Sequence, residues 1–136
     1  MSLNYYEPQE VQASKLVLIS KVEPLEGLVI RNLGFPSGAE VTHLQETLWP
    51  DNKPPTSYER IKYIIDFIAK RREERPESPV IIHCSAGVGR TGTLIAIYTL
   101  IEALQHQLKL CDAEVSVFGV VRRLREQRWG MVRNQH

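Results

Sequence analysis

The first third of the chain alternates short apolar runs with residues that favour turns. The apolar runs cover residues 16–19, 28–33 and 41–44. The residues that punctuate them are glycines and prolines, namely Pro24, Gly27, Gly34, Pro36 and Gly38. Runs of this length, bounded by turn residues, are typical of β-strands. The pattern therefore predicts three strands joined by turns.

A helical pattern begins after a loop that contains three prolines. Residues 49–55, WPDNKPP, are expected to form a loop because proline disfavours both helix and strand. Thr56 and Glu59 then have the T-x-x-E spacing of a capping box, and isoleucines follow at positions 61, 64, 65 and 68. This spacing predicts an amphipathic helix that begins at Thr56 and ends before Pro76.

The second half of the chain predicts one more strand and two more helices. Residues 79–83, PVIIH, are apolar without alternation, which is typical of a short buried strand. Residues 91–107 are apolar almost all round, so we expect this helix at the centre of the fold. Residues 116–128 carry an apolar face with four arginines elsewhere, which predicts a surface helix. Together these elements indicate an α/β fold with a sheet covered by helices.

Composition narrows the class of protein. A chain of 136 residues, with 43% apolar and 24% charged residues, fits one globular domain. Its net charge of +1 gives no electrostatic reason to bind nucleic acid or a membrane surface. No apolar run approaches the roughly 20 residues that a membrane helix needs.

The number of cysteines and the first residues of the chain indicate in which cellular compartment the protein is expected. Cys84 and Cys111 are too few for a disulfide framework, and the first ten residues are polar and acidic rather than an apolar secretory signal. We therefore expect a reducing environment, the cytoplasm. His83 adjoins Cys84 and His106 lies far downstream, so the paired spacing of a structural zinc site is missing and we expect no metal.

Residues 83–92, HCSAGVGRTG, hold most of the chemistry in the sequence. They lie between the expected strand 79–83 and the expected helix 91–107. A glycine-bearing loop of this kind turns backbone N–H groups inward, and the start of the following helix adds positive potential. The segment is therefore predicted to bind an anion.

Two nucleotide-binding patterns fit this loop incompletely. Gly87-x-Gly89-x-x-Gly92 matches the dinucleotide fingerprint, but the acidic residue about twenty positions on is missing, since Glu102 falls inside the expected helix. The first and last of these glycines also match the frame of a nucleoside triphosphate loop. That pattern fails because residues 93 and 94 are threonine and leucine where lysine and serine or threonine are required.

A thiolate site accounts for all the polar residues of the loop. Cys84 at the mouth of an electropositive loop has its ionised form favoured, whereas an ordinary thiol is only a few per cent ionised at pH 7. Arg90 can hold two phosphoryl oxygens with its planar guanidinium, and Thr91 brings a hydroxyl close to the sulfur. Most free cysteines are small core residues, but a core cysteine leaves Ser85, Arg90 and Thr91 in the same turn unexplained.

The segment from His83 to Gly92 resembles the Cys-x5-Arg signature of the classical protein tyrosine phosphatases. Trp49-Pro50-Asp51 looks like the mobile general-acid loop of that family. Residues 118–131 resemble the helix before its water-positioning glutamine loop, and Gly89-Arg90-Thr91-Gly92 is closest to the tyrosine-specific branch. The resemblance covers residue 40 to the end of the chain and implies a central mixed sheet flanked by helices.

The resemblance also implies roles for individual residues. Cys84 is expected to attack phosphorus, Asp51 to act as general acid and then base, and Thr91 to ease departure of the thiolate. His83 is expected to orient the cysteine, with Trp49 and Pro50 serving as the hinge of the acid loop. The residues expected to bind the phosphate are Ser85, Ala86, Gly87, Val88, Gly89 and Arg90. No cofactor is implied, and the expected partners are phosphotyrosine-containing proteins.

Two departures from the family leave a second class of function open. Arg133 follows Met131 and Val132 where the family has its water-positioning glutamine, and Gln135 could replace that glutamine only with a shift in register. Nothing in residues 1–39 resembles the phosphotyrosine-recognition loop. We therefore expect residues 1–136 to form the C-terminal part of one phosphatase domain, from a receptor or a non-receptor parent. The alternative is a catalytically weak or silent phosphatase-like module that binds phosphotyrosine or a protein partner.

Overall fold

The computed structural model describes residues 16–108 and 115–133. By their contacts, the residues fall into two compact units, Met1–Thr47 and Leu48–His136. The first unit contains the strands and the second contains the helices and the expected site. The chain combines strands and helices, as the predicted α/β class requires, with all the described strands before the helices.

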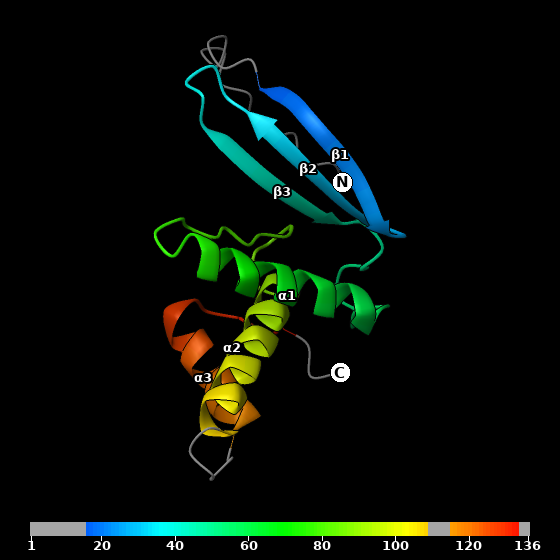
Figure 1. Cartoon of the computed structure of the whole chain (residues 1–136). Helices are drawn as coiled ribbons and strands as arrows, with labels where there is room; N and C mark the ends of the chain where they lie inside the picture. Colours follow the sequence, from blue (N-terminus) through cyan, green and yellow to red (C-terminus); the bar gives the residue numbers. More distant parts are fainter. Residues whose placement is uncertain (1–15, 109–114, 134–136) are drawn as a thin grey trace. The chain divides into compact units, whose positions relative to one another are not determined.

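The first unit is an antiparallel sheet whose strands follow one another in chain order (Figure 1). It consists of β1 (Val17–Leu25), β2 (Leu28–Gly34) and β3 (Glu40–Glu46). All three predicted strands are present. They extend beyond the apolar runs because polar residues such as Lys21, which lies opposite Arg31, also pair across the sheet.

Two short turns connect these strands. Gly27 joins β1 to β2 with a φ of 78°, a left-handed conformation that favours glycine, and its amide donates to the Glu23 carboxylate at 2.8 Å. Gly38 has a φ of 84° and its amide donates to the carbonyl of Phe35 at 2.9 Å in the turn before β3. Gly27 and Gly38 therefore have the conformations for which glycine is needed. Pro24 and Gly34, which were also predicted to lie in turns, are instead part of β1 and β2.

The second unit contains α1 (Tyr58–Glu74), α2 (Arg90–Leu108) and α3 (Val117–Gln127). The N-cap of α1 is Ser57, whose hydroxyl accepts from the amide of Arg60 at 3.2 Å, so the prediction that this helix begins at Thr56 was wrong by one residue. Thr56 instead donates to the carbonyl of Leu48 at 3.1 Å and ties the preceding loop to the helix. The predicted isoleucine face is confirmed at its first three positions, 61, 64 and 65, which are buried.

Helices α2 and α3 lie side by side and run in opposite directions (Figure 1). A buried cluster joins them, formed by Ala96 of α2, Leu124 of α3 and Met131 after α3. Val88, from the loop that precedes α2, packs against the same cluster, as does Val132. The loop with the expected chemistry is therefore held against the α2–α3 pair by apolar contacts.

The predicted strand at residues 79–83 is not formed. This segment has no regular secondary structure, and the side chains of Val80 and Ile81 are 45% and 84% exposed. A strand is stable only when another strand accepts its hydrogen bonds, and among the described residues only β1, β2 and β3 pair. The described sheet is consequently antiparallel rather than mixed.

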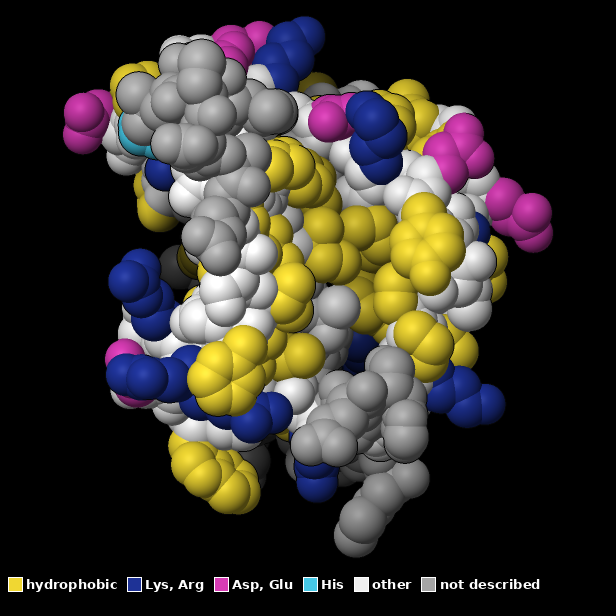
Figure 2. Space-filling model, turned by 90° about the horizontal axis from the view of Figure 1, so that it is seen from below, with side chains coloured by type: hydrophobic (Ala, Val, Ile, Leu, Met, Phe, Trp, Pro, Cys, Tyr) yellow, Lys and Arg dark blue, Asp and Glu magenta, His cyan; other side chains and the backbone are white. Residues whose placement is uncertain are grey.

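Several other apolar side chains are exposed. Figure 2 shows hydrophobic side chains, in yellow, across much of one face of the molecule. Leu104 of α2 is 43% exposed, although the sequence pattern placed this helix at the centre of the fold. No helix within residues 16–108 and 115–133 has the length and apolar character needed to cross a bilayer.

Candidate active site

The loop before α2 has the conformation expected of an anion site. Residues 85–89 form a series of bends, and Arg90 is the first residue of the helix. Gly87 has a φ of 69°, in the left-handed region. The amide and hydroxyl of Thr93 bond the carbonyl of Gly89 at 2.9 and 3.0 Å, which closes the first turn of α2. The loop therefore leads directly into a helix N-terminus, where backbone amides favour negative charge.

Cys84 is half-buried at the start of this loop and its thiol is shifted toward the ionised form. Partial burial acts to raise the pKa of Cys84, but hydrogen bonding by the side chain of Thr91 and by the amides of Thr91 and Gly87 lowers it. The charge of Arg90 also lowers the pKa, and the net effect is a pKa below the ordinary value. The thiolate is the nucleophilic form of cysteine.

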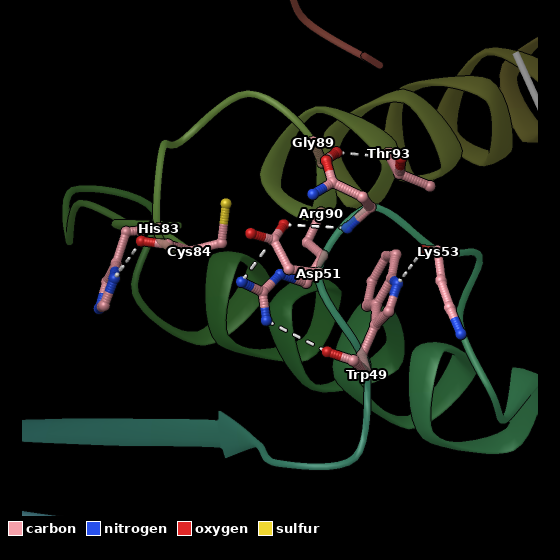
Figure 3. Close-up of polar contacts among 9 residues, drawn as sticks. Trp49, Asp51, Lys53, His83, Cys84, Gly89, Arg90 and Thr93 are labelled. Carbon is pink, nitrogen blue, oxygen red and sulfur yellow. Dashed lines mark hydrogen bonds and ion pairs between the residues drawn. The ribbon is translucent and has the colours of Figure 1, made fainter. Parts of the chain in front are cut away.

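Arg90 connects this loop with the loop at residues 49–55. Its Nη1 donates to the carbonyl of Trp49 at 3.1 Å, and its Nη2 lies 3.6 Å from Oδ1 of Asp51. Figure 3 shows Cys84, Asp51 and Arg90 gathered in one place, with the guanidinium directed toward the Trp49–Asp51 segment. Three residues from two distant stretches of sequence are thus brought together.

The loop that carries Asp51 is held by its own hydrogen bonds. Trp49 is only 8% exposed, and its indole donates to the carbonyl of Lys53 at 2.8 Å (Figure 3). Oδ1 of Asp51 accepts from the amide of Asn52, which has a left-handed φ of 58°. Pro50 is exposed, and the carboxylate side chain of Asp51 is 57% exposed. The loop therefore places an accessible carboxylate beside the arginine, with a buried tryptophan as its fixed point.

His83 precedes Cys84 in the chain and Thr91 follows Arg90, and the two side chains differ in their exposure to solvent. Nδ1 of the exposed His83 is 3.4 Å from the carbonyl oxygen of Cys84, so the ring contacts the backbone of the cysteine. Thr91 is 5% exposed, and its hydroxyl has no nitrogen or oxygen partner in the described part of the chain. This hydroxyl interacts with the Cys84 sulfur and lowers the pKa of the thiol.

Sequence reasoning missed the residues that support the loop from the C-terminal side. Arg125 of α3 donates to the carbonyls of Met131 and Val132 at 3.0 and 3.1 Å. The amide of Val132 donates to the carbonyl of Val88 in the loop at 3.0 Å, and Arg128 reaches the carbonyl of Ala86 at 3.4 Å. The only sequence signal for this support was the spacing of Arg125 and Arg128, which lie three positions apart just before Gly130.

Gly92 fits the same supporting contact. A Cβ added to this residue would lie 2.5 Å from the amide nitrogen of Val132, which is too close for any side chain. Val132 itself has a φ of 55°, an uncommon conformation for a β-branched residue. The close backbone contact between α2 and the segment after α3 thus requires glycine at position 92.

Three further residues that the sequence analysis discussed are not part of this arrangement. Arg133 is exposed, and Cys111 and Gln135 lie outside the described residues. Within those residues, no group of three or more histidine, cysteine, aspartate and glutamate side chains could hold a metal ion. The site therefore consists of a half-buried thiol, a loop that favours anions, an arginine and an accessible carboxylate, which suits nucleophilic chemistry on an anionic ester.

An α/β fold with this thiolate and arginine constellation defines a class of phosphate-ester enzymes. Residues 4–136 match the family model described as protein-tyrosine phosphatase. The chain belongs to the protein-tyrosine phosphatase family.

Individual relatives agree with this assignment. The chain is 32% identical over 120 residues to the mouse tyrosine-protein phosphatase non-receptor type 13, and 31% identical over 134 residues to the human receptor-type tyrosine-protein phosphatase R. These alignments cover 85% and 96% of this chain, but only 5% and 20% of the relatives.

Solved structures show the same relation. The catalytic domain of human protein tyrosine phosphatase non-receptor type 18 is 29% identical and superposes with a TM-score of 0.78. A protein tyrosine phosphatase from Trypanosoma brucei is 28% identical, with a TM-score of 0.72. The matches cover 94% and 96% of this chain and 46% and 48% of those structures, so the chain spans about half the length of its structural neighbours.

Proposed function

We propose that the protein hydrolyses phosphotyrosine in other proteins through a phosphocysteine intermediate. The observation that carries the proposal is the direct contact of Arg90 with the loop of Asp51, beside a Cys84 thiol whose pKa is lowered. Nucleophile, anion-binding group and proton donor thereby lie within one site. Family membership supports the same reaction class.

In the first step, the Cys84 thiolate attacks phosphorus in line with the leaving phenolic oxygen. A bond forms between sulfur and phosphorus, the bond between phosphorus and the tyrosine oxygen breaks, and Asp51 in its protonated form gives its proton to that oxygen. Arg90 and the amides of residues 85–90 stabilise the charge on the equatorial phosphoryl oxygens. The substrate protein, whose tyrosine side chain now carries a free hydroxyl, leaves the site.

In the second step, water attacks the phosphocysteine. Asp51, now a carboxylate, accepts a proton from the water, the bond between sulfur and phosphorus breaks, and inorganic phosphate forms. Thr91 eases departure of the thiolate, because the same groups that lower the pKa of Cys84 make the sulfur a better leaving group. His83 helps position the cysteine through its contact with the Cys84 carbonyl.

Three assignments complete the proposal. Residues 1–136 form part of a single phosphatase domain, which in the parent protein lies in the cytoplasm or in the cytoplasmic portion of a receptor. The partners are phosphotyrosine-containing proteins. Trp49 and Pro50 act as the hinge that sets the position of Asp51, since the buried indole is the fixed point of that loop.

The test is turnover of 4-nitrophenyl phosphate by the full-length protein. Cys84→Ser should abolish turnover and keep phosphate binding, because the cradle consists of backbone amides and Arg90. Cys111→Ser is the matched control and should leave turnover unchanged.

One observation favours a second candidate, a silent module that binds phosphotyrosine. Arg133 follows Val132, whose amide is bonded to the Val88 carbonyl, and it stands where the family has its water-positioning glutamine. Tight binding of a phosphotyrosine peptide by the unaltered protein, without release of phosphate, would support the silent module and overturn the enzyme.

A further inference from the structure

Two hydrogen bonds of Thr56 close the loop that carries Asp51. The Thr56 hydroxyl donates to the carbonyl of Leu48 at 3.1 Å, so the residue after the loop is bonded to the residue before it. The same hydroxyl accepts from Nη2 of Arg60 at 2.6 Å. A charged donor polarises the hydroxyl and thereby strengthens the bond that the hydroxyl donates. We refer to these two bonds, which join Leu48, Thr56 and Arg60, as the Thr56 bridge.

The Thr56 bridge is attached to the first turn of α1. The hydroxyl of Ser57, the N-cap, accepts from the amide of Arg60 at 3.2 Å, so the backbone that carries the Arg60 side chain is fixed. Ile61, the next residue, is 4% exposed and holds this turn in the core. The carbonyl of Leu48 is therefore bonded to a part of the chain that is itself held in place.

The next carbonyl along the chain is bonded to a different helix. The carbonyl of Trp49 accepts from Nη1 of Arg90, the first residue of α2, at 3.1 Å (Figure 3). Two consecutive carbonyls are thus bonded to the starts of α1 and α2. Asp51 lies two residues beyond Trp49, and Pro50 between them has a fixed φ. The place of the Asp51 carboxylate therefore depends on how these two carbonyls are held.

We infer that Thr56 is a positioning residue that holds Asp51 beside Arg90 for proton transfer. The inference rests on the proposed function. Thr56 acts through the backbone of the loop rather than on the substrate. A general acid must lie within hydrogen-bond reach of the leaving oxygen, so a small displacement of the loop slows proton donation. Cys84 is not part of the Thr56 bridge, and its attack on phosphorus should not depend on it.

Steady-state kinetics of the full-length protein tests this role with two substrates. Phenyl phosphate has a weakly acidic leaving group that needs a proton, whereas the leaving group of 2,4-dinitrophenyl phosphate is acidic and needs none. Thr56→Val keeps the shape of the side chain and removes the hydroxyl. In this variant kcat for phenyl phosphate should fall roughly three- to tenfold, the effect of losing one hydrogen bond. For 2,4-dinitrophenyl phosphate kcat should change less than about twofold, as should KM for both substrates.

Two control variants separate positioning from a general effect on structure. Thr56→Ser retains a hydroxyl and should restore most of kcat for phenyl phosphate. Thr47→Val removes a hydroxyl that also donates to a carbonyl, that of Gly27 at 3.0 Å, and should change none of these constants. The inference is overturned if Thr56→Val lowers kcat equally for both substrates, if it lowers neither, or if Thr47→Val causes the same selective loss.

A double variant tests whether Thr56 acts through Asp51. In an Asp51→Asn background no proton is delivered by residue 51, so adding Thr56→Val should lower kcat for phenyl phosphate by less than about twofold further. The two substitutions would then be strongly non-additive. A further loss as large as that in the otherwise unaltered protein would show that Thr56 affects catalysis by another route, and would refute the inference.

Failure of the proposed function gives a different result. If the unaltered protein releases no phosphate from either substrate, catalysis is wrong and the position of the loop is measured directly. The readout is the fluorine NMR resonance of Trp49 in protein labelled with 5-fluorotryptophan, assigned by its absence in Trp49→Phe. Because Trp49 is buried, Thr56→Val should move this resonance toward that of an exposed indole, and Thr47→Val should not. An unmoved resonance in Thr56→Val would mean that the Thr56 bridge does not hold the loop.

Discussion

At the scale of single residues, Arg90 has two roles that compete with each other. Its guanidinium contacts the Trp49 carbonyl and the Asp51 carboxylate, and the proposed reaction needs the same group for the phosphoryl oxygens. A substrate phosphate therefore has to displace or share the contact with Asp51. Displacement would also free the Asp51 side chain for proton transfer.

Arg90→Lys tests the need for a planar guanidinium. We expect kcat/KM for 4-nitrophenyl phosphate to fall roughly a hundred- to a thousandfold, because an ammonium group cannot make two parallel hydrogen bonds to the transition state. Steady-state kinetics measures the loss. Arg122→Lys on the exposed surface of α3 is the matched control, and a comparable loss there would show that the effect is not specific to the site.

Asp51→Asn separates proton donation from binding. We expect kcat for an alkyl-substituted phenyl phosphate to fall roughly 10²- to 10⁴-fold with little rise in KM, because a proton is delivered only in the transition state. Phosphate inhibition should strengthen, since the carboxylate no longer competes for Arg90. A kinetic series with increasingly acidic phenols should show a shrinking loss, whereas a constant loss would assign the general acid to another residue.

The lowered pKa of Cys84 predicts a particular pH dependence. Burial opposes ionisation, but the interactions of Thr91, Gly87 and Arg90 outweigh it, so the thiolate persists to lower pH than in an ordinary cysteine. Alkylation of Cys84 by iodoacetamide should therefore reach half its maximal rate below the pH typical of free thiols. Thr91→Val should raise the pKa and move that midpoint to higher pH, and an unmoved midpoint would exclude the hydroxyl as a cause.

At the scale of elements, local sequence signals predicted most of the secondary structure. The ends of α3 were predicted within one residue, because Ser116 caps the helix through its own hydroxyl and the amide of Gly119. Cys84, Arg90 and Asp51 were predicted from short motifs, which carry their chemistry within a few residues. The support from Arg125 was not predictable because it depends on how α3 and the following turn fold together.

Gly92→Ala tests the close contact between α2 and the segment after α3. Replacing glycine by alanine inside a helix ordinarily stabilises it by up to about 1 kcal/mol. Here the new Cβ would meet the Val132 amide at 2.5 Å, so we expect the free energy of unfolding to fall by about 1–3 kcal/mol.

Chemical denaturation of the full-length Gly92→Ala variant measures this loss. Gly89→Ala is the control, because its Cβ would have no atom within 4 Å, and its cost should not exceed about 1 kcal/mol. If the unaltered protein and Gly92→Ala have the same free energy of unfolding, the backbone at Val132 can move to accommodate the new Cβ without loss of stability.

At the scale of the whole molecule, sequence analysis could not predict which apolar residues are exposed. A run such as residues 79–83 predicts burial, but which polypeptide buries it depends on pairing across distant segments. Leu18, Ile19 and Val22 of β1 are each more than half exposed, as is Ile81. Short motifs predicted the phosphatase class, but they did not predict which apolar residues are buried in the core.

The isolated 136-residue chain should reveal this surface. We expect it to bind the dye ANS strongly and to unfold without a sharp thermal transition, because apolar patches of this kind favour association and loose packing. Dye fluorescence and a thermal melt on one purified sample measure both properties. A cooperative transition with weak dye binding would show that the described contacts suffice for a stable core.

The attachment of the Cys84 loop to residues 128–132 has a consequence for the gene that encodes this chain. A splice junction or premature stop codon that removed residues 129–136 would delete the Val132 amide from the loop and leave every proposed catalytic side chain in place. The product would retain the full signature motif while its phosphate cradle lost a hydrogen bond. A survey of transcripts that searched for the motif alone would count such an isoform as an active enzyme.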